Sequence, residues 1–343
     1  SYYIPKLVEL TGFELELAVQ LFYGGIVGLA FFVGAIGSWK YCNTQIGKWV
    51  SLLALSVLSF VIAGISDIYV VMGASTISLV PWLFYLQKNS SVKEILIFCT
   101  IAGFIIGFSH SLRNHGGTGV LIVIIFSILF SKKYSPKIKV CCGAALMVGI
   151  VMISLFFGHI QTQRDVYLDS IKYDGPKTNQ RVVWHNLYLS LGYLWNVYGY
   201  EEWPGHEPSD SYSIRKALSV NPEVQLFSHE YENILKHEYF KFIKDHPFFF
   251  INTIFAKLGV LLMYVLIFAN IGLVLAIYYP QGYQFNLLFA VGIGFNMLFG
   301  LVGFPWYQYL MGLFAFAAFF GVFSIDHAVA NGFLKQIKFS KKK

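Results

Sequence analysis

The chain has 343 residues, of which 56% are hydrophobic and 13% are charged, and its formal net charge at pH 7 is +7. This composition is too apolar for a soluble globular protein, so we expect a polytopic membrane protein. The basic balance does not indicate a nucleic-acid partner, because the lysines gather in short connections between apolar runs.

Nine apolar runs, nearly free of charge, have about the 20 residues that a helix needs to cross the hydrocarbon of a bilayer. They lack the alternation of polar and apolar residues that is typical of a transmembrane β-barrel. The sequence therefore predicts an all-α fold of about nine transmembrane helices. The runs lie at 17–39, 49–66, 68–87, 95–112, 115–131, 138–158, 258–279, 285–304 and 306–325.

Lysines occupy every second connection between these runs, which is the positive-inside pattern and predicts that those connections face the cytoplasm. The other connections then face outward. We predict a six-helix block at 1–158, an extracytoplasmic loop domain at 159–257, and a three-helix block at 258–343 whose basic tail contacts lipid headgroups. The lysines in question are Lys40, Lys48, Lys88, Lys93, Lys132, Lys133, Lys137, Lys139, Lys335, Lys338, Lys341, Lys342 and Lys343.

The first candidate site is the stretch "GFSHSLRNHGGTG" at 107–119, a predicted outer turn. Arg113 is the basic residue of this turn, with His115 beside it, and an arginine there runs against the positive-inside bias. The planar fork of a guanidinium suits phosphate oxygens. Two interpretations stay open: Arg113 and His115 bind a lipid-linked phosphate, or the arginine snorkels to headgroups.

The next candidates lie where the loop domain meets the membrane. Arg164 and Asp165 follow the sixth predicted helix, Arg181 precedes "WHNLYLSLGY", which contains His185, and Lys257 stands at the outer end of the seventh predicted helix. A ring of cations here would meet the head of a lipid-borne substrate. The alternative is ordinary juxtamembrane charge paired with loop carboxylates. The histidines lack the spacing of zinc ligands.

Further along the loop, aromatic residues alternate with carboxylates over 193–210, among them Trp203 and Glu201. Aromatic faces stack on sugar rings, and carboxylates accept hydrogen bonds from hydroxyls, so this segment is a candidate carbohydrate site. The alternative is an aromatic belt at the membrane interface.

The loop is predicted to close with a helix at 229–245, which Ser228 can cap. One face of this helix carries apolar residues at helical spacing: Tyr231, Leu235, Tyr239 and Phe242. That apolar face is expected to lie on the membrane surface or against the rest of the loop. Asp67, between two apolar runs, is interpreted as a turn residue.

Two segments resemble the GT-C membrane glycosyltransferases, particularly the protein mannosyltransferase and aminoarabinose-transferase branch. "SYYIPKLVELTGFELELAVQLFYGGIVGLAFFVGAI" resembles the region after their first outer loop, and "YFKFIKDHPFFFINTIFAKLGVLL" resembles the helix, proline and lysine-bearing segment that re-enters the membrane after a large loop. The resemblance implies transfer of a sugar from a polyprenyl-phosphate donor to a lipid, glycan or protein acceptor on the outer face.

The resemblance also implies a catalytic aspartate in a first outer loop, which we expect upstream of Ser1 together with a further transmembrane helix. Within the sequence, Asp165 is the candidate base, and Arg113, Arg164 and Lys257 are candidates for stabilising the departing phosphate. The expected location is a bacterial inner membrane or an endoplasmic reticulum membrane, with membrane lipids and other membrane subunits as partners. A metal requirement is left undecided.

Two alternatives to this enzyme stay open. A non-catalytic subunit could keep the same architecture to scaffold a larger membrane complex. An O-antigen polymerase or ligase would also combine many helices with a large outer loop. A secondary transporter is disfavoured because the sequence lacks paired repeats.

Overall fold

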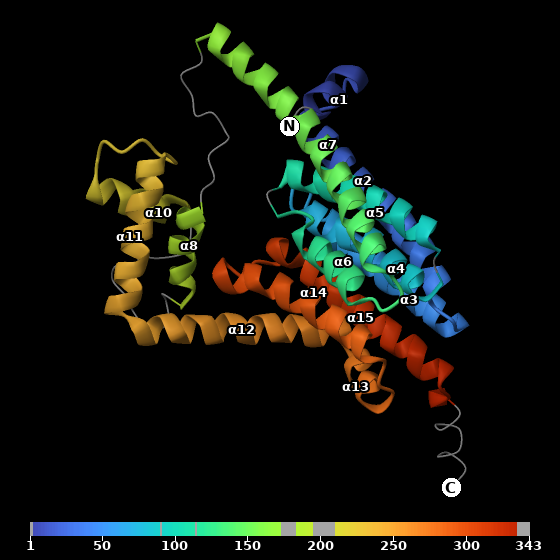
Figure 1. Cartoon of the computed structure of the whole chain (residues 1–343). Helices are drawn as coiled ribbons and strands as arrows, with labels where there is room; N and C mark the ends of the chain where they lie inside the picture. The colour runs from blue at the N-terminus through green and yellow to red at the C-terminus, as the bar shows by residue number, and fades with distance from the viewer. Residues whose placement is uncertain (1–2, 90, 114, 173–182, 195–209, 335–343) are drawn as a thin grey trace. The chain divides into compact units, whose positions relative to one another are not determined.

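The computed structural model describes residues 3–89, 91–113, 115–172, 183–194 and 210–334, and over these residues it contains helices and no strand (Figure 1). The contacts divide the chain into two compact units. Unit 1 comprises residues 1–160, 264–296 and 307–343, and unit 2 comprises residues 161–263 and 297–306.

Eight of the described helices are long and apolar enough to cross a membrane, which confirms a multi-pass, all-helical membrane protein. The helical elements are α1 (Tyr3–Thr11), α2 (Leu15–Tyr41), α3 (Gln45–Ala63), α4 (Val70–Asn89), α5 (Val92–Leu112), α6 (Thr118–Phe130), α7 (Pro136–Ser170), α8 (Val183–Leu191), η1 (Gly192–Leu194), α10 (Asp210–Val220), α11 (His229–Asp245), α12 (Pro247–Ala269), α13 (Ile271–Tyr278), α14 (Tyr283–Val302), η2 (Tyr307–Leu310) and α15 (Met311–Ala330).

Three predicted spans differ from the observed helices. The run at 115–131 forms only the 13-residue α6, about 20 Å long and too short to cross about 30 Å of hydrocarbon alone. The run at 138–158 belongs to the 35-residue α7, which continues to Ser170.

The seventh span, predicted at 258–279, is wrong in position. Its helix, α12, begins at Pro247, and proline suits the first position of a helix because its missing N–H has no partner there anyway. The helix ends at Ala269, because Asn270 has φ 39° and ψ −130° and interrupts the hydrogen-bonding ladder before α13. Lys257 consequently lies in the middle of α12 and not at its outer end.

Small residues allow the helices of unit 1 to pack closely. Gly103 and Gly107, spaced as in G-x-x-x-G, face the backbone of α7 at Gly149 and Ile150, so that a Cβ at either position would collide. Gly321 of α15 lies in the same way against Ala269. Larger side chains fill the middle of the unit, where the rings of Phe84 and Phe289 stack with centroids 4.7 Å apart.

A buried carboxylate near the C-terminus of the chain, Asp326, binds the start of α3 near the N-terminus. Asp326 of α15 is 2% exposed and accepts hydrogen bonds from the backbone N–H of Asn43 (3.0 Å), the N–H of Thr44 (2.9 Å) and the hydroxyl of Thr44 (2.6 Å). These groups begin α3, whose first N–H groups have no partner within the helix. Negative charge is favourable at this positive end of a helix, so Asp326 acts as a cap from a distant helix.

Unit 2 has its own hydrophobic core, built from α8, α10, α11 and the first part of α12. Its buried members include Tyr188, Leu191, Ala217, Tyr231, Leu235, Phe242 and Phe249. The helix predicted at 229–245 is confirmed as α11, and Ser228 caps it by accepting a hydrogen bond from Tyr231 N–H at 3.1 Å. Its apolar face was predicted to lie either on the membrane surface or against the rest of the loop, and it packs against α8 and α10 of the loop.

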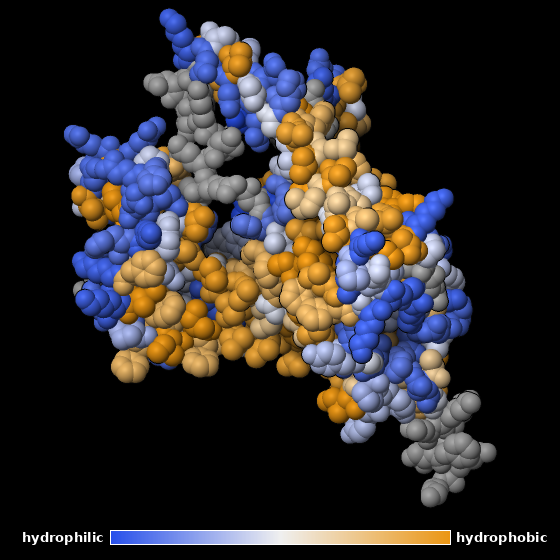
Figure 2. Space-filling model, in the orientation of Figure 1, coloured by the Kyte–Doolittle hydropathy of each residue, from blue (hydrophilic) through white to orange (hydrophobic). Residues whose placement is uncertain are grey.

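The surface of unit 2 changes character at the start of α12. Figure 2 shows hydrophilic side chains over α10 and α11 and hydrophobic ones along α12. The exposed residues of α12 include Phe248 (80%), Ile251 (46%) and Phe255 (66%). This apolar face is what a helix in contact with lipid requires.

Candidate functional site

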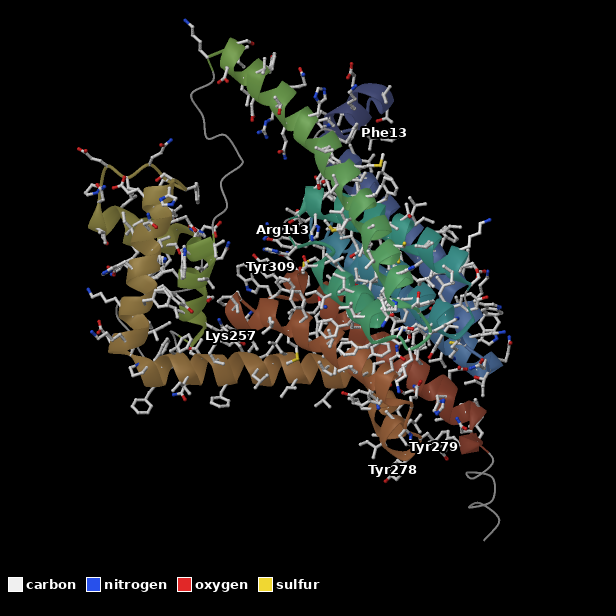
Figure 3. All side chains as sticks on the ribbon, in the orientation of Figure 1. Phe13, Arg113, Lys257, Tyr278, Tyr279 and Tyr309 are labelled. Carbon is white, nitrogen blue, oxygen red and sulfur yellow. The ribbon has the colours of Figure 1, made fainter. Side chains whose placement is uncertain are left out.

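In unit 1, Arg113 is the centre of a cluster formed by three separate turns, which we call the Arg113 cluster: Tyr69, Arg113 and Tyr309. Tyr69 lies just before α4. Arg113 ends α5, and Tyr309 belongs to η2 (Figure 3). The guanidinium carbon of Arg113 is 4.4 Å from the centroid of the Tyr69 ring and 6.0 Å from that of Tyr309. Both distances are within the range of cation–π attraction.

The two tyrosines support each other and keep the rings in place. Their rings meet edge to face with centroids 4.8 Å apart, and their hydroxyl oxygens are 3.2 Å apart. Burial raises the pKa of the Tyr69 phenol, and the hydrogen bond with Tyr309 adds to the rise, while Arg113 opposes it. Tyr69 is therefore neutral at ordinary pH and presents an uncharged ring to the guanidinium.

The glycines after Arg113 are required by close packing. The N–H groups of His115 and Gly116 donate to the carbonyl oxygen of Arg113 at 2.9 and 2.8 Å, which closes the turn. A Cβ on Gly116 would meet the carbonyl oxygen of Ser109 at 2.5 Å. His115 is exposed and has φ 142°, a conformation that non-glycine residues seldom adopt. The turn thus holds Arg113 in a defined position.

The guanidinium of Arg113 is left available by its surroundings. In the segments that the structure describes, no carboxylate forms an ion pair with it. Its guanidinium carbon lies over the Tyr69 ring, and within the described residues no carboxylate competes with a ligand for its N–H donors. A half-buried arginine of this kind can bind two oxygens of a phosphate or carboxylate in one plane.

Arg164 and Asp165 are brought together in unit 2, on α7. The guanidinium donates through Nε (2.9 Å) and one terminal nitrogen (2.6 Å) to the same carboxylate oxygen of Asp165. About a third of each side chain is exposed. Asp165 is thus engaged by its neighbour, as the alternative of ordinary juxtamembrane pairing expects, and its role as a base stays a prediction.

Lys257 is buried and hydrogen-bonded to backbone carbonyl oxygens. Its side chain is 1% exposed, and its ammonium donates to the carbonyl oxygens of Gly303 (2.7 Å) and Leu301 (3.4 Å), with the Tyr193 ring centroid 5.9 Å away. These carbonyls belong to the end of α14, where helical C=O groups lack partners and positive charge is favourable. Lys257 therefore caps α14 from α12.

His185 is similarly engaged inside unit 2. It is 3% exposed, with Nδ1 2.6 Å from the Tyr231 hydroxyl and Nε2 3.2 Å from a carboxylate oxygen of Asp210. A tyrosine that donates to Nδ1 leaves the Nε2–H to donate to Asp210, so a neutral imidazole is fully satisfied. Contact between His185 and a substrate stays a prediction.

Three sequence-predicted site residues, Arg181, Glu201 and Trp203, lie outside the described residues. Within the described ones, no group of three or more histidine, cysteine, aspartate or glutamate side chains could hold a metal ion. Of the three residues predicted to stabilise the departing phosphate, Arg113 belongs to unit 1, and Arg164 and Lys257 belong to unit 2.

Sequence reasoning missed Tyr69 and Tyr309 as partners of Arg113. They stand 240 positions apart in adjoining turns, and the only signal available was that each is an aromatic residue at the end of an apolar run. No family model, curated protein or solved structure matches this chain.

Proposed function

We propose that this protein is a membrane glycosyltransferase-like protein that takes a sugar from a polyprenyl-phosphate donor and passes it to a lipid, glycan or protein acceptor on the outer face. The observation that carries the proposal is the Arg113 cluster. An arginine held on an aromatic platform at the end of an apolar helix, with no ion pair to a carboxylate of the described residues, suits a phosphate attached to a lipid chain.

The chemistry assigned to Arg113 is electrostatic. Glycosyl transfer from a polyprenyl phosphate leaves negative charge on the departing phosphate, and a fixed guanidinium stabilises that charge as it develops. Tyr69 and Tyr309 orient the guanidinium without neutralising it, because both present aromatic rings rather than carboxylates.

Binding of polyprenyl phosphate to the purified protein in nanodiscs tests this role. Arg113→Ala is expected to weaken binding about 10- to 100-fold, because the net loss of one charge-assisted hydrogen bond is about 1.5–3 kcal/mol. Arg113→Lys should restore only part of the affinity, since lysine lacks the planar fork. Arg215→Ala, which removes an exposed arginine of α10, is the matched control.

Transfer of labelled sugar should fall with binding in Arg113→Ala while the protein keeps its elution profile and melting temperature. Unchanged affinity and unchanged turnover in Arg113→Ala would remove the basis of the proposal. Loss of both in Arg215→Ala would show that charge alone, and not the cluster, governs the assay.

A scaffold subunit is the second candidate, and one observation favours it. Asp165, the candidate base, accepts a hydrogen bond from Arg164, and Lys257, a candidate for stabilising the phosphate, donates to the end of α14. Both groups are therefore engaged within the protein. A scaffold would show no transfer from any polyprenyl-phosphate sugar and would co-purify with an integral membrane partner. Transfer by the isolated protein excludes it.

A further inference from the structure

One face of α11 lines a shallow groove of about 600 Å³, which we call the α11 groove: Asn233, Lys236, His237, Phe240, Lys241 and Lys244. These residues recur at helical spacing. Phe240 stands nine residues after Tyr231, which places the two about 180° apart around the helix. The α11 groove is therefore the face opposite the one buried in the core of unit 2.

The α11 groove carries positive charge because three of the four acidic residues of α11 have partners outside it, although Glu238 also lies 3.8 Å from the imidazole of His237. Glu232 accepts from the backbone N–H of Trp184 (2.7 Å) and His185 (3.1 Å), which begin α8. Glu238 pairs with Lys216 at 3.0 Å, and Glu230 accepts from the amide of Asn221 at 2.9 Å.

The lysines of the groove, unlike Glu238, form no ion pair in the part of the chain that the structure describes. Within the described residues no carboxylate pairs with Lys236, Lys241 or Lys244, and Asp245 is the single acid at the end of the groove. The face therefore keeps a net positive charge, which favours an anionic partner.

Aromatic rings lie among these lysines. Phe240 is 53% exposed, and its ring centroid is 5.4 Å from that of Trp184. The ammonium of Lys236 lies 5.5 Å from the Trp184 ring. An exposed aromatic platform between cations has affinity for a flat apolar face that carries negative charge at its edge, which is the character of an acidic sugar ring.

The direction of α12 argues against a bilayer as the partner. Phe249 of α12 packs on Phe242 of the buried face of α11, and Lys257 reaches the Tyr193 ring in η1, which continues α8. The membrane-crossing helix thus leaves α11 on the side where α8 packs, as Figure 1 shows within unit 2. The α11 groove lies on the face of α11 opposite the core and is exposed there, while its edge, Lys236 and Phe240, contacts Trp184 of α8.

We propose that the α11 groove binds an acidic saccharide, with Lys236, Lys241 and Lys244 contacting its carboxylate, sulfate or phosphate groups and Phe240 stacking on a ring. The inference rests on the proposed glycosyl transfer, for which an acidic glycan would be the acceptor. It adds a chemical class of acceptor and a docking surface to that function.

The test is binding of heparin-derived oligosaccharides to the full chain in nanodiscs of zwitterionic lipid. The triple variant Lys236→Glu, Lys241→Glu, Lys244→Glu should bind at least about tenfold more weakly than the wild type. Its control is Lys132→Glu, Lys133→Glu, Lys137→Glu, which makes the same change of net charge at exposed positions just before and at the start of α7 and should bind normally. Affinity should also fall as salt rises.

Phe240→Ala distinguishes a saccharide from other anions. It should weaken binding of the oligosaccharide, whereas Phe248→Ala, at an 80% exposed position of α12, should not. Equal binding by both triple variants would overturn the proposal. So would tighter binding of polyglutamate or of phosphatidylglycerol vesicles than of the oligosaccharide, or insensitivity to Phe240→Ala, since each assigns another class of partner.

The outcomes separate this inference from the proposed function. The groove triple variant should still bind polyprenyl phosphate, and Arg113→Ala should still bind the oligosaccharide. Loss of polyprenyl-phosphate binding in Arg113→Ala together with groove-independent saccharide binding would keep the glycosyltransferase proposal and overturn the acidic-acceptor inference.

Discussion

Replacement of Asp326 by asparagine is expected to destabilise unit 1 without changing its shape. The carboxylate accepts three hydrogen bonds at the start of α3, two of them from backbone N–H groups. An amide of the same size must place its NH2 against one of these donors. At least one bond is then lost, and the negative charge at the end of the helix is lost with it.

The cost follows from the geometry. Hydrogen bonds to a charged group contribute about 1.5–3 kcal/mol each, and a well-placed charge at a helix terminus contributes up to about 2 kcal/mol. We expect Asp326→Asn to lower the free energy of unfolding by about 2–4 kcal/mol, and Asp326→Ala, which removes all three acceptors, to lower it by about 4–6 kcal/mol. At about 2–4 °C per kcal/mol, the asparagine variant should melt roughly 4–16 °C lower.

Thermal unfolding in detergent, followed by size-exclusion of the soluble fraction, measures this shift. The matched control is Glu94→Gln, which alters the capping box of α5 with Ser91 at an exposed site where glutamine serves nearly as well. A melting temperature for Asp326→Asn equal to that of the wild type would refute the interpretation of Asp326 as a cap. An equal decrease in Glu94→Gln would show that the assay reports any lost carboxylate.

Two further predictions concern packing and pH. Gly321→Ala should destabilise the protein by about 1–3 kcal/mol, because its Cβ would collide with the carbonyl oxygen of Ala269. Gly294→Ala, at a position with open space around it, should not destabilise the protein. Equal melting temperatures of the two variants would contradict this prediction. Burial raises the pKa of the Tyr231 phenol above its unfolded value of about 10, so the stability from its neutral form is complete below about pH 10 and is lost as the pH rises further. Proteolysis of unit 2 should therefore accelerate above about pH 10 in the wild type. Tyr231→Phe should reduce that acceleration, but not remove it because burial also raises the pKa of Tyr239, and it should cost about 1 kcal/mol from the lost bond to His185. A pH profile identical in both proteins would contradict this.

Local signals in the sequence were sufficient where one helix contains its own determinants. The helix α11 was predicted with both boundaries because Ser228 and the spacing of its apolar residues lie within that segment. Apolar length likewise located most of the membrane-spanning helices. The end of α12 was predicted wrongly, because hydropathy does not register a single residue, Asn270, whose backbone conformation ends a helix inside an apolar run.

Contacts between distant segments were beyond such reasoning. Lys257 was located as a cation, yet its partners are carbonyl oxygens 44 and 46 residues away at the end of α14. Asp326 caps a helix whose N-cap residue, Thr44, lies 282 residues earlier. Arg113 was identified as unusual because it breaks a charge rule, but its aromatic supports could be found only from the fold.

The most direct test of the central claim is photo-crosslinking with a diazirine-bearing polyprenyl phosphate, followed by mapping of the labelled peptides. The account predicts label in the three turns that contain Tyr69, Arg113 and Tyr309, displaced by unlabelled polyprenyl phosphate and lost in Arg113→Ala. Label distributed over the apolar helices, with the same pattern and intensity in Arg113→Ala, would contradict it.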